Sequence, residues 1–369
     1  MQLKASGPPT LDLRGSPKKI GFQHGMHLQK QIKKQISVYE EMFQFTSQIS
    51  WDTVKDHSRE FQVTIQSLTP DLYAEMEGIA EGAGLDVLDI VALNCRSELG
   101  VALFTNVSDG CTSVSWKKSE NSRILAQNWD WTSLVQGNLV CMSIEQAGKP
   151  KVYMVTEAGI VGKIGFNSAG VGTALNAIKA HSYDTSKLPI QVALRLCLES
   201  TSVENALKTI SSLGGIASAQ HILVADSKES IGLEISPQGE VVCIEEDDSG
   251  LITHTNHFVA NRSVEDHIVH PESPIRLDRV QEIIDDLIDS GIHGGNATPA
   301  LLREKIFSDV YNAPQSIRRQ EDLTRHPTMR SSTLFNIIMD LDPASPKAEV
   351  VIGQPGSGVE SSVVTIPWA

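Results

Sequence analysis

The chain has 369 residues, of which 40% are apolar and 21% charged, a composition typical of a globular protein with a sizeable core. Its net charge of −14 is spread along the sequence without a basic face, so we expect no nucleic acid partner. No apolar run reaches the roughly 18 residues of a transmembrane helix and the start lacks the apolar stretch of a signal peptide, so we expect a cytoplasmic protein without a membrane partner.

Residues 1–110 are predicted to form a mainly helical N-terminal segment. Apolar residues recur at helical spacing over 32–43, and a second helix is expected over 58–68. Pro70 and Asp71 indicate the start of a third helix, which Gly82 and Gly84 end. The apolar stretch 86–100 continues as helix. At Gly110 the sequence changes from helical to strand-like patterning.

Residues 111–369 alternate between groups of predicted strands and pairs of predicted helices. Runs with strand spacing cover 112–116, 123–131, 138–146, 151–160 and 170–178. Two helices follow over 189–200 and 203–213, then strands over 217–227, 230–237, 240–246 and 251–260. Helices over 276–291 and 298–309 precede closing strands over 331–341 and 348–353. This order predicts an α+β fold of two stacked antiparallel sheets between helical layers, because a doubly wound parallel sheet needs regular strand–helix alternation.

The five cysteines form an odd set without a C-x-x-C pair. We therefore expect no disulfide framework, no zinc site and no cofactor. Four of them lie in apolar runs and are predicted to be buried and inert: Cys95, Cys141, Cys197 and Cys243. Cys111 is different, because it stands at the junction between the helical segment and the first strand.

The Gly110–Cys111 pair has the chemistry of a self-cleaving peptide bond. Glycine leaves its carbonyl open to attack and tolerates the strained backbone that favours an N-to-S acyl shift. Water then resolves the thioester and leaves Cys111 with a thiol and a free α-amine, which can accept the thiol proton as general base. The pair alone is a weak signal, since a single cysteine after glycine is more often a small apolar core residue.

Longer strings around this pair carry a family resemblance. In order they are DGCTS, LAQNWDW, TEAGIVGKIGFNSAGV, LPIQVALRLCLESTS, GLEISP, THTNH and TLFNII. With similar separations, from about Gly15 to Val351, they resemble the fungal acyl-coenzyme A:isopenicillin N acyltransferase family. The resemblance implies a four-layer αββα N-terminal nucleophile hydrolase fold, a precursor that cuts itself before a cysteine, and acyl transfer through a thioester. It also implies that fragments 1–110 and 111–369 remain partners in one structural domain.

Carried over residue by residue, the resemblance assigns the nucleophile to Cys111 and the cut to the Gly110–Cys111 bond. It assigns the family's aspartate to Asp130, whose carboxylate could orient the freed amine and stabilise its protonated form. The alternative for Asp130 is a cap of the turn before Thr132. Asn256 falls on an oxyanion-hole donor, a role that suits an uncharged amide.

Arg330 matches the arginine that precedes the closing strand in the family. Its guanidinium group could stabilise the oxyanion, bond Asp130 or bind a substrate carboxylate. The alternative is an ordinary surface arginine. His254 and His257 flank Asn256, but His-x-x-His without a glutamate is poor zinc geometry on a strand, where residues three apart face opposite ways. We therefore expect no metal.

The sequence departs from the family at positions that bear on the substrate. Met329 and Ala219 stand where the penicillin-forming enzymes carry serines, with Ser218 one place before the second. The chain ends Pro367-Trp368-Ala369 rather than in a peroxisomal tripeptide, which again favours the cytosol. A penicillin substrate is therefore in doubt, although the thiol chemistry is unaffected.

Three functions fit these residues. The first is transfer of an acyl group from acyl-CoA, as a co-substrate, or from an amide to an amine. The second is hydrolysis of the same small-molecule acyl donors by the same site. The third is a non-catalytic binding module, which is disfavoured because Cys111, Asp130, Asn256 and Arg330 are all present.

Overall fold

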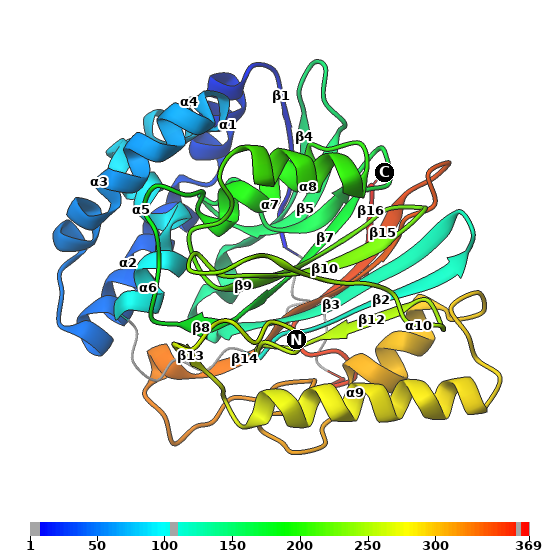
Figure 1. Cartoon of the computed structure of the whole chain (residues 1–369). Coiled ribbons are helices and arrows are strands. Elements are labelled where there is room, and N and C mark those ends of the chain that lie inside the picture. Colours follow the sequence, from blue (N-terminus) through cyan, green and yellow to red (C-terminus); the bar gives the residue numbers. More distant parts are fainter. Residues whose placement is uncertain (1–7, 104–109, 359–362, 369) are drawn as a thin grey trace, which may run out of the picture.

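The computed structural model describes residues 8–103, 110–358 and 363–368. Its strands form two large sheets, with helices on both outer faces and a further group of helices at one end (Figure 1). The four-layer α+β arrangement predicted from the sequence is therefore confirmed. Asp109 and Ala369, which entered the sequence argument, lie outside the described residues.

The first sheet has eight strands and takes one of them from the N-terminal segment. Strand β1 runs parallel to β4, and all other neighbouring pairs are antiparallel. The order is β1 (Thr10–Arg14), β4 (Leu139–Glu145), β5 (Val152–Glu157), β6 (Ile164–Asn167), β7 (Gly172–Ala177), β9 (Gln220–Ala225), β10 (Ser230–Ile235) and β11 (Val242–Ile244).

The second sheet has six strands and is antiparallel throughout. The order is β12 (Leu251–His254), β2 (Thr112–Ser119), β3 (Ser122–Thr132), β14 (Ser331–Asp340), β15 (Lys347–Ile352) and β16 (Val364–Ile366). Two short strands, β8 (Lys179–Ala180) and β13 (His267–Ile268), pair with each other. Between the two sheets lies a shared apolar core that includes Leu125, Phe166 and Phe335.

Helices cover the outer face of each sheet. In Figure 1, α7 (Ile190–Leu198) and α8 (Val203–Ser212) lie over the eight-stranded sheet, and α9 (Glu272–Asp289) lies under the six-stranded one. The apolar stripe of α9 packs its Val280 and Ile284 with Trp116 and Ile338 of the sheet. The short helix α10 (Pro299–Leu302) completes this layer.

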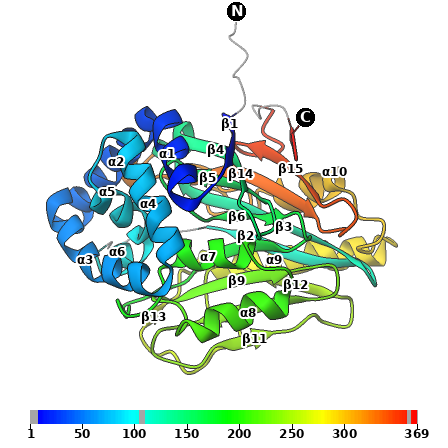
Figure 2. The same ribbon diagram turned by 90° about the horizontal axis from the view of Figure 1, so that it is seen from above.

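The N-terminal helices gather beside one end of the sheets, as both views show (Figures 1 and 2). They are α1 (Pro17–His27), α2 (Gln29–Ser47), α3 (Trp51–Leu68), α4 (Pro70–Ala83), α5 (Val87–Asn94) and α6 (Arg96–Leu103). Helices α1 and α4 approach so closely that only glycine fits at their crossing. A Cβ atom on Gly21 would lie 1.9 Å from the carbonyl oxygen of Glu75, and one on Gly25 2.1 Å from that of Ile79.

Several element boundaries differ from the predictions for identifiable reasons. Helix α3 begins at Trp51 because the side chain of Ser50 caps it by accepting a hydrogen bond from the Thr53 backbone N–H. The strand predicted over 251–260 ends at His254, since the next residues turn around the Glu234 carboxylate. The predicted helix 298–309 is α10 followed by a wider helical turn, Arg303–Phe307. Strands β1, β6, β8, β13 and β16 were not predicted.

Within the described ranges, each helix is either too short or too polar to cross a membrane.

Candidate active site

At one end of the six-stranded sheet, the ends of two strands lie beside the starts of two others. Because neighbouring strands are antiparallel, the start of β2 lies beside the end of β3 and the end of β12, and the start of β14 lies beside the end of β3. The register pairs Thr112 with Asn128, Ser113 with His254, and Thr333 with Asp130. Cys111, Asp130 and Asn256 therefore lie at the same end of the sheet, although they are far apart in the sequence.

Cys111 is buried at the start of β2, with 3% of its surface exposed. Its Sγ atom lies 3.9 Å from the carbonyl oxygen of Asp130. Among the other cysteines, Cys95, Cys141 and Cys197 are buried, and burial raises the pKa of the Cys197 thiol to about 12. The prediction that Cys243 is buried is wrong: it lies exposed on the short strand β11, at the end of the eight-stranded sheet.

Gly110 is packed so closely against two buried side chains that a side chain of its own would force them to shift. A Cβ atom there would lie 2.6 Å from Nη1 of Arg319 and 2.7 Å from Oδ2 of Asp130. Nη2 of Arg319 in turn lies 3.6 Å from the Glu272 carboxylate. The residue before Cys111 thus lies between a buried guanidinium and a buried carboxylate.

The carboxylate of Asp130 is bonded across the sheet by β14. Its Oδ1 atom accepts a hydrogen bond of 2.7 Å from the hydroxyl of Thr333 on β14. The same hydroxyl accepts a bond of 2.9 Å from the backbone N–H of Arg319. Thr333 therefore fixes both the aspartate and the segment that carries Arg319.

Arg276, near the start of α9, connects Cys111 with Asn256. Its Nη1 atom donates to the Cys111 carbonyl oxygen at 2.7 Å, and its Nη2 atom donates to Oδ1 of Asn256 at 2.8 Å. Since a guanidinium only donates, this contact fixes which end of the Asn256 amide is oxygen. Burial, aided by Arg319, lowers the pKa of Arg276 to about 10, so it is charged at neutral pH.

The sequence argument missed both Arg276 and Arg319. For Arg276 a signal existed: it falls on the apolar stripe of α9 with Val280, Ile283 and Ile284. A charged residue at a buried helical position is uncommon unless it has a partner. For Arg319 no comparable signal exists, because it lies in an irregular segment whose position depends on contacts with β14.

Arg330 makes its side-chain contacts within the loop before β14. Its Nε and Nη2 atoms donate to the backbone carbonyls of Arg325 and Leu323 at 2.9 and 3.2 Å. The guanidinium groups that contact Cys111, Asn256 and the Gly110 backbone region are those of Arg276 and Arg319. Met329, next to Arg330, is buried.

The remaining candidate side chains hold the structure around the site. The Ser218 hydroxyl donates to the buried carboxylate of Glu98 at 2.9 Å. His254 bonds Glu234 through Nε2 and the Thr255 carbonyl through Nδ1, and His257 bonds the Ser273 hydroxyl at 2.8 Å. In the part of the chain that the structure describes, no three His, Cys, Asp or Glu side chains are arranged to hold a metal ion.

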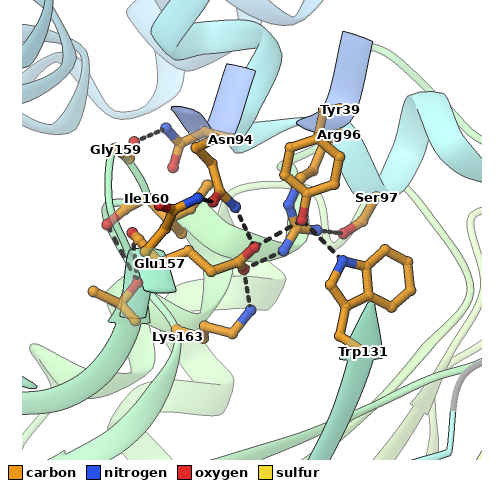
Figure 3. A network of polar contacts seen from close by, with 12 residues as sticks. Tyr39, Asn94, Arg96, Ser97, Trp131, Glu157, Gly159, Ile160 and Lys163 are labelled. Carbon is orange, nitrogen blue, oxygen red and sulfur yellow. Dashed lines mark hydrogen bonds and ion pairs between the residues drawn. The ribbon is translucent and has the colours of Figure 1, made fainter. Parts of the chain in front are cut away.

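A buried ionic network lies on the opposite sheet, at the end of β5 (Figure 3). The Glu157 carboxylate accepts hydrogen bonds from Lys163, Arg96 and Tyr39. Burial would raise the pKa of Glu157, but Arg96 and Lys163 outweigh it and bring the pKa to about 2. The Lys163 ammonium lies 3.7 Å from the centre of a Trp129 ring. Trp129 belongs to the other sheet and directly precedes Asp130 in the sequence.

Comparison with known proteins identifies the class. Residues 116–357 match the model of the family described as acyl-coenzyme A:6-aminopenicillanic acid acyl-transferase. The chain is 36% identical over 355 residues to the 40 kDa form of acyl-coenzyme A:6-aminopenicillanic-acid-acyltransferase of Emericella nidulans, covering 95% of this chain and 94% of that protein. These matches define an enzyme of the acyltransferase class. The chain belongs to the acyl-coenzyme A:6-aminopenicillanic acid acyl-transferase family.

Among solved structures, the chain has a more distant likeness to penicillin V acylase from Agrobacterium tumefaciens. The identity is 16% and the TM-score 0.41, over 69% of this chain and 86% of that one.

Proposed function

We propose that this acyltransferase processes itself and uses Cys111 as its nucleophile, through a cut of the Gly110–Cys111 bond. The observation that carries the proposal is the environment of that bond. Gly110 is packed between Arg319 and Asp130, and Arg276 donates to the Cys111 carbonyl oxygen. Such fixed donors and charges can hold a peptide group in a reactive geometry and stabilise the charge that develops on it.

Self-processing would proceed in two steps. The Cys111 sulfur adds to the Gly110 carbonyl carbon, the C–N bond breaks, and the Cys111 nitrogen takes up a proton to become a free α-amine. Water then adds to the thioester, leaves a carboxylate on Gly110 and returns the thiol. The products are fragments 1–110 and 111–369.

Acyl transfer would use the same sulfur. The α-amine accepts the thiol proton, Asp130 orients that amine, and Asn256 donates a hydrogen bond to the oxyanion. Attack on an acyl-CoA or an amide releases the CoA thiol or an amine, and an amine acceptor then takes the acyl group from the thioester. Arg330, which is partly exposed, is proposed to meet a carboxylate of the substrate.

The two fragments are proposed to stay together as one structural domain. Strand β1 and helices α1–α6 belong to the first fragment, and β1 is hydrogen-bonded along its length to β4 of the second. Arg96 and Tyr39 of the first fragment also bond Glu157 of the second. These contacts support a cut enzyme that keeps both parts.

The test compares wild type with Cys111→Ala and Cys111→Ser on a denaturing gel and in an assay with acyl-CoA and a panel of amines that includes 6-aminopenicillanic acid. We expect the wild-type chain to be cut and its two fragments to co-elute under native conditions. The Cys111→Ala variant should stay uncut and inactive. The Cys111→Ser variant should cut itself and transfer acyl groups more slowly, because a hydroxyl is the weaker nucleophile. The matched control is Cys197→Ser, which removes a buried cysteine on α7. An active alanine variant contradicts the proposal, and exclusive hydrolysis of the thioester contradicts the transfer step.

A further inference from the structure

His254 is a buried histidine at the end of β12, two residues before Asn256. Its Nδ1 atom lies 2.7 Å from the Thr255 carbonyl oxygen, and its Nε2 atom lies 2.9 Å from Oε1 of Glu234. A carbonyl oxygen and an ionised carboxylate both accept hydrogen bonds and donate none. If Glu234 is ionised, both ring nitrogens of His254 must donate, and the ring is a doubly protonated imidazolium.

Glu234 is ionised, because its carboxylate is surrounded by donors. The backbone N–H groups of Val259, Ala260 and Asn261 donate to its two oxygens, in addition to His254. Burial would raise the pKa of Glu234, but these hydrogen bonds outweigh burial and lower it. Both side chains of the pair are fully buried. The carboxylate on β10 and the imidazolium on β12 therefore form a buried ion pair.

The ring of His221 on β9 stacks on the His254 ring, with ring centres 3.5 Å apart and the planes 14° from parallel. Nδ1 of His221 donates to Oδ1 of Asn176 at 3.0 Å, and its buried Nε2 atom has no hydrogen-bond partner among the residues that the structure describes. Burial, together with His254, lowers the pKa of His221 well below 6.5. The two stacked rings thus share a single charge, which belongs to His254.

The peptide group that joins Thr255 to Asn256 is held at both ends. His254 donates to its carbonyl oxygen, and its N–H donates to the hydroxyl of Ser273 on α9 at 2.8 Å. These two bonds fix the plane of the peptide group, and with it the direction in which the Asn256 side chain leaves the backbone. Arg276 bonds the amide at the end of that side chain, so His254 and Arg276 act on different parts of the same residue.

We propose that His254 is a positioning residue: as an imidazolium paired with Glu234, it holds the peptide group that places Asn256 at the oxyanion. The proposal rests on the proposed function of Asn256. A neutral ring has one N–H and cannot donate to both acceptors, so one of them would be left buried and unpaired. His254 keeps both protons throughout the reaction. Its loss should therefore lower kcat and leave KM nearly unchanged, because the donor for the oxyanion is displaced.

The first experiment determines the protonation of His254 by NMR of the full chain, labelled with ¹⁵N at histidine. The spectrum is recorded at about pH 7.5, where an unperturbed histidine is mostly neutral. We expect one histidine with two protonated ring nitrogens, and we expect its signals to be absent from the spectrum of His254→Gln. A spectrum in which no histidine is doubly protonated overturns the proposal. Assignment of the doubly protonated ring to another histidine overturns it too.

The second experiment measures kcat and KM of His254→Gln with the acyl-CoA and amine panel. We expect kcat to fall by about tenfold or more and KM to change by less than about threefold. The matched control is His24→Gln, which replaces a buried histidine on α1 that accepts from a backbone N–H. If His254 acts through Asn256, the double variant His254→Gln/Asn256→Ala is no slower than Asn256→Ala.

An unchanged kcat in His254→Gln, or fully multiplicative losses in the double variant, overturns the proposal. If His254→Gln does not fold, the wild-type spectrum decides, since the proposal requires a doubly protonated histidine there. An Asn256→Ala variant with unchanged kcat refutes the oxyanion role itself. The spectrum then distinguishes that failure from a wrong assignment of the charge to His254.

Discussion

At the scale of single residues, Arg276 is the side chain through which Cys111 and Asn256 are joined. Its two terminal nitrogens donate to the Cys111 carbonyl and to Oδ1 of Asn256, so the Asn256 Nδ2 group points the other way and donates to the Ala177 carbonyl at 2.9 Å. An amide nitrogen carries two hydrogens. The second hydrogen on Nδ2 of Asn256 can therefore bond the oxyanion, as proposed, only while Arg276 holds the amide in this orientation.

We predict that Asn256→Ala lowers kcat by about 10²–10³-fold, the usual effect of losing an oxyanion donor. Arg276→Lys should also lower kcat strongly, because a point charge cannot bond both groups at once. If Arg276 acts through Asn256, the double variant is no slower than Asn256→Ala. The control is Arg279→Lys, one turn further along α9 in ion pairs with Glu282 and Asp309. Fully multiplicative losses in the double variant would show that Arg276 acts independently.

At the scale of elements, the crossing of α1 and α4 depends on glycines that leave room for backbone against backbone. The four glycines of the crossing are spaced four apart on each helix: Gly21, Gly25, Gly78 and Gly82. Both helices contact α2, from which Tyr39 reaches Glu157. The crossing therefore supports the ionic network from a distance.

We predict that Gly25→Val lowers the free energy of unfolding by at least about 3 kcal/mol, because the side chain would meet the Ile79 carbonyl and force the helices apart. Gly137→Ala is the control, since a Cβ atom there meets nothing within 4 Å. Urea denaturation of the two variants makes the comparison. Equal midpoints would mean that the crossing can widen at no cost.

The strand ends explain how much of the site the sequence could predict. The resemblance named Cys111, Asp130 and Asn256, and the antiparallel order of β12, β2 and β3 brings them to one edge. Arg319 could not be found, because its position follows from contacts with β14 rather than from a local pattern. Strand β1 was missed although Leu11 and Leu13 alternate with exposed polar residues, because a run of five residues is a short signal at the start of a segment that is otherwise helical.

At the scale of the whole molecule, buried titratable groups make the free energy of unfolding depend on pH. His24 of α1 accepts a hydrogen bond from the Gly159 backbone N–H at 2.9 Å. Burial, with Arg195, lowers its pKa from 6.5 to about 3. The unfolded chain therefore takes up a proton below pH 6.5 that the folded chain refuses until about pH 3. Glu157 acts at lower pH, since its carboxylate contributes stability above pH 4.5 that is lost towards pH 2.

We predict that the free energy of unfolding falls between pH 7 and pH 4, with roughly 3 kcal/mol of the loss due to His24. His24→Gln, which can still accept from Gly159, should lose much less stability over this range. His57→Gln, at an exposed position of α3, is the control. Urea denaturation at both pH values is the measurement, and an undiminished loss in His24→Gln would contradict the assignment.

The parallel pairing of β1 with β4 joins the two fragments into which the chain is proposed to be divided. While the peptide chain is continuous, strand β1 is tethered to its neighbour and folding is a one-molecule event. Division turns refolding into an encounter between two separate polypeptides, whose rate depends on concentration. If the chain is divided as proposed, synthesis as one precursor secures correct assembly and the later division makes unfolding hard to reverse. The lifetime of such an enzyme would then be governed by how slowly it unfolds.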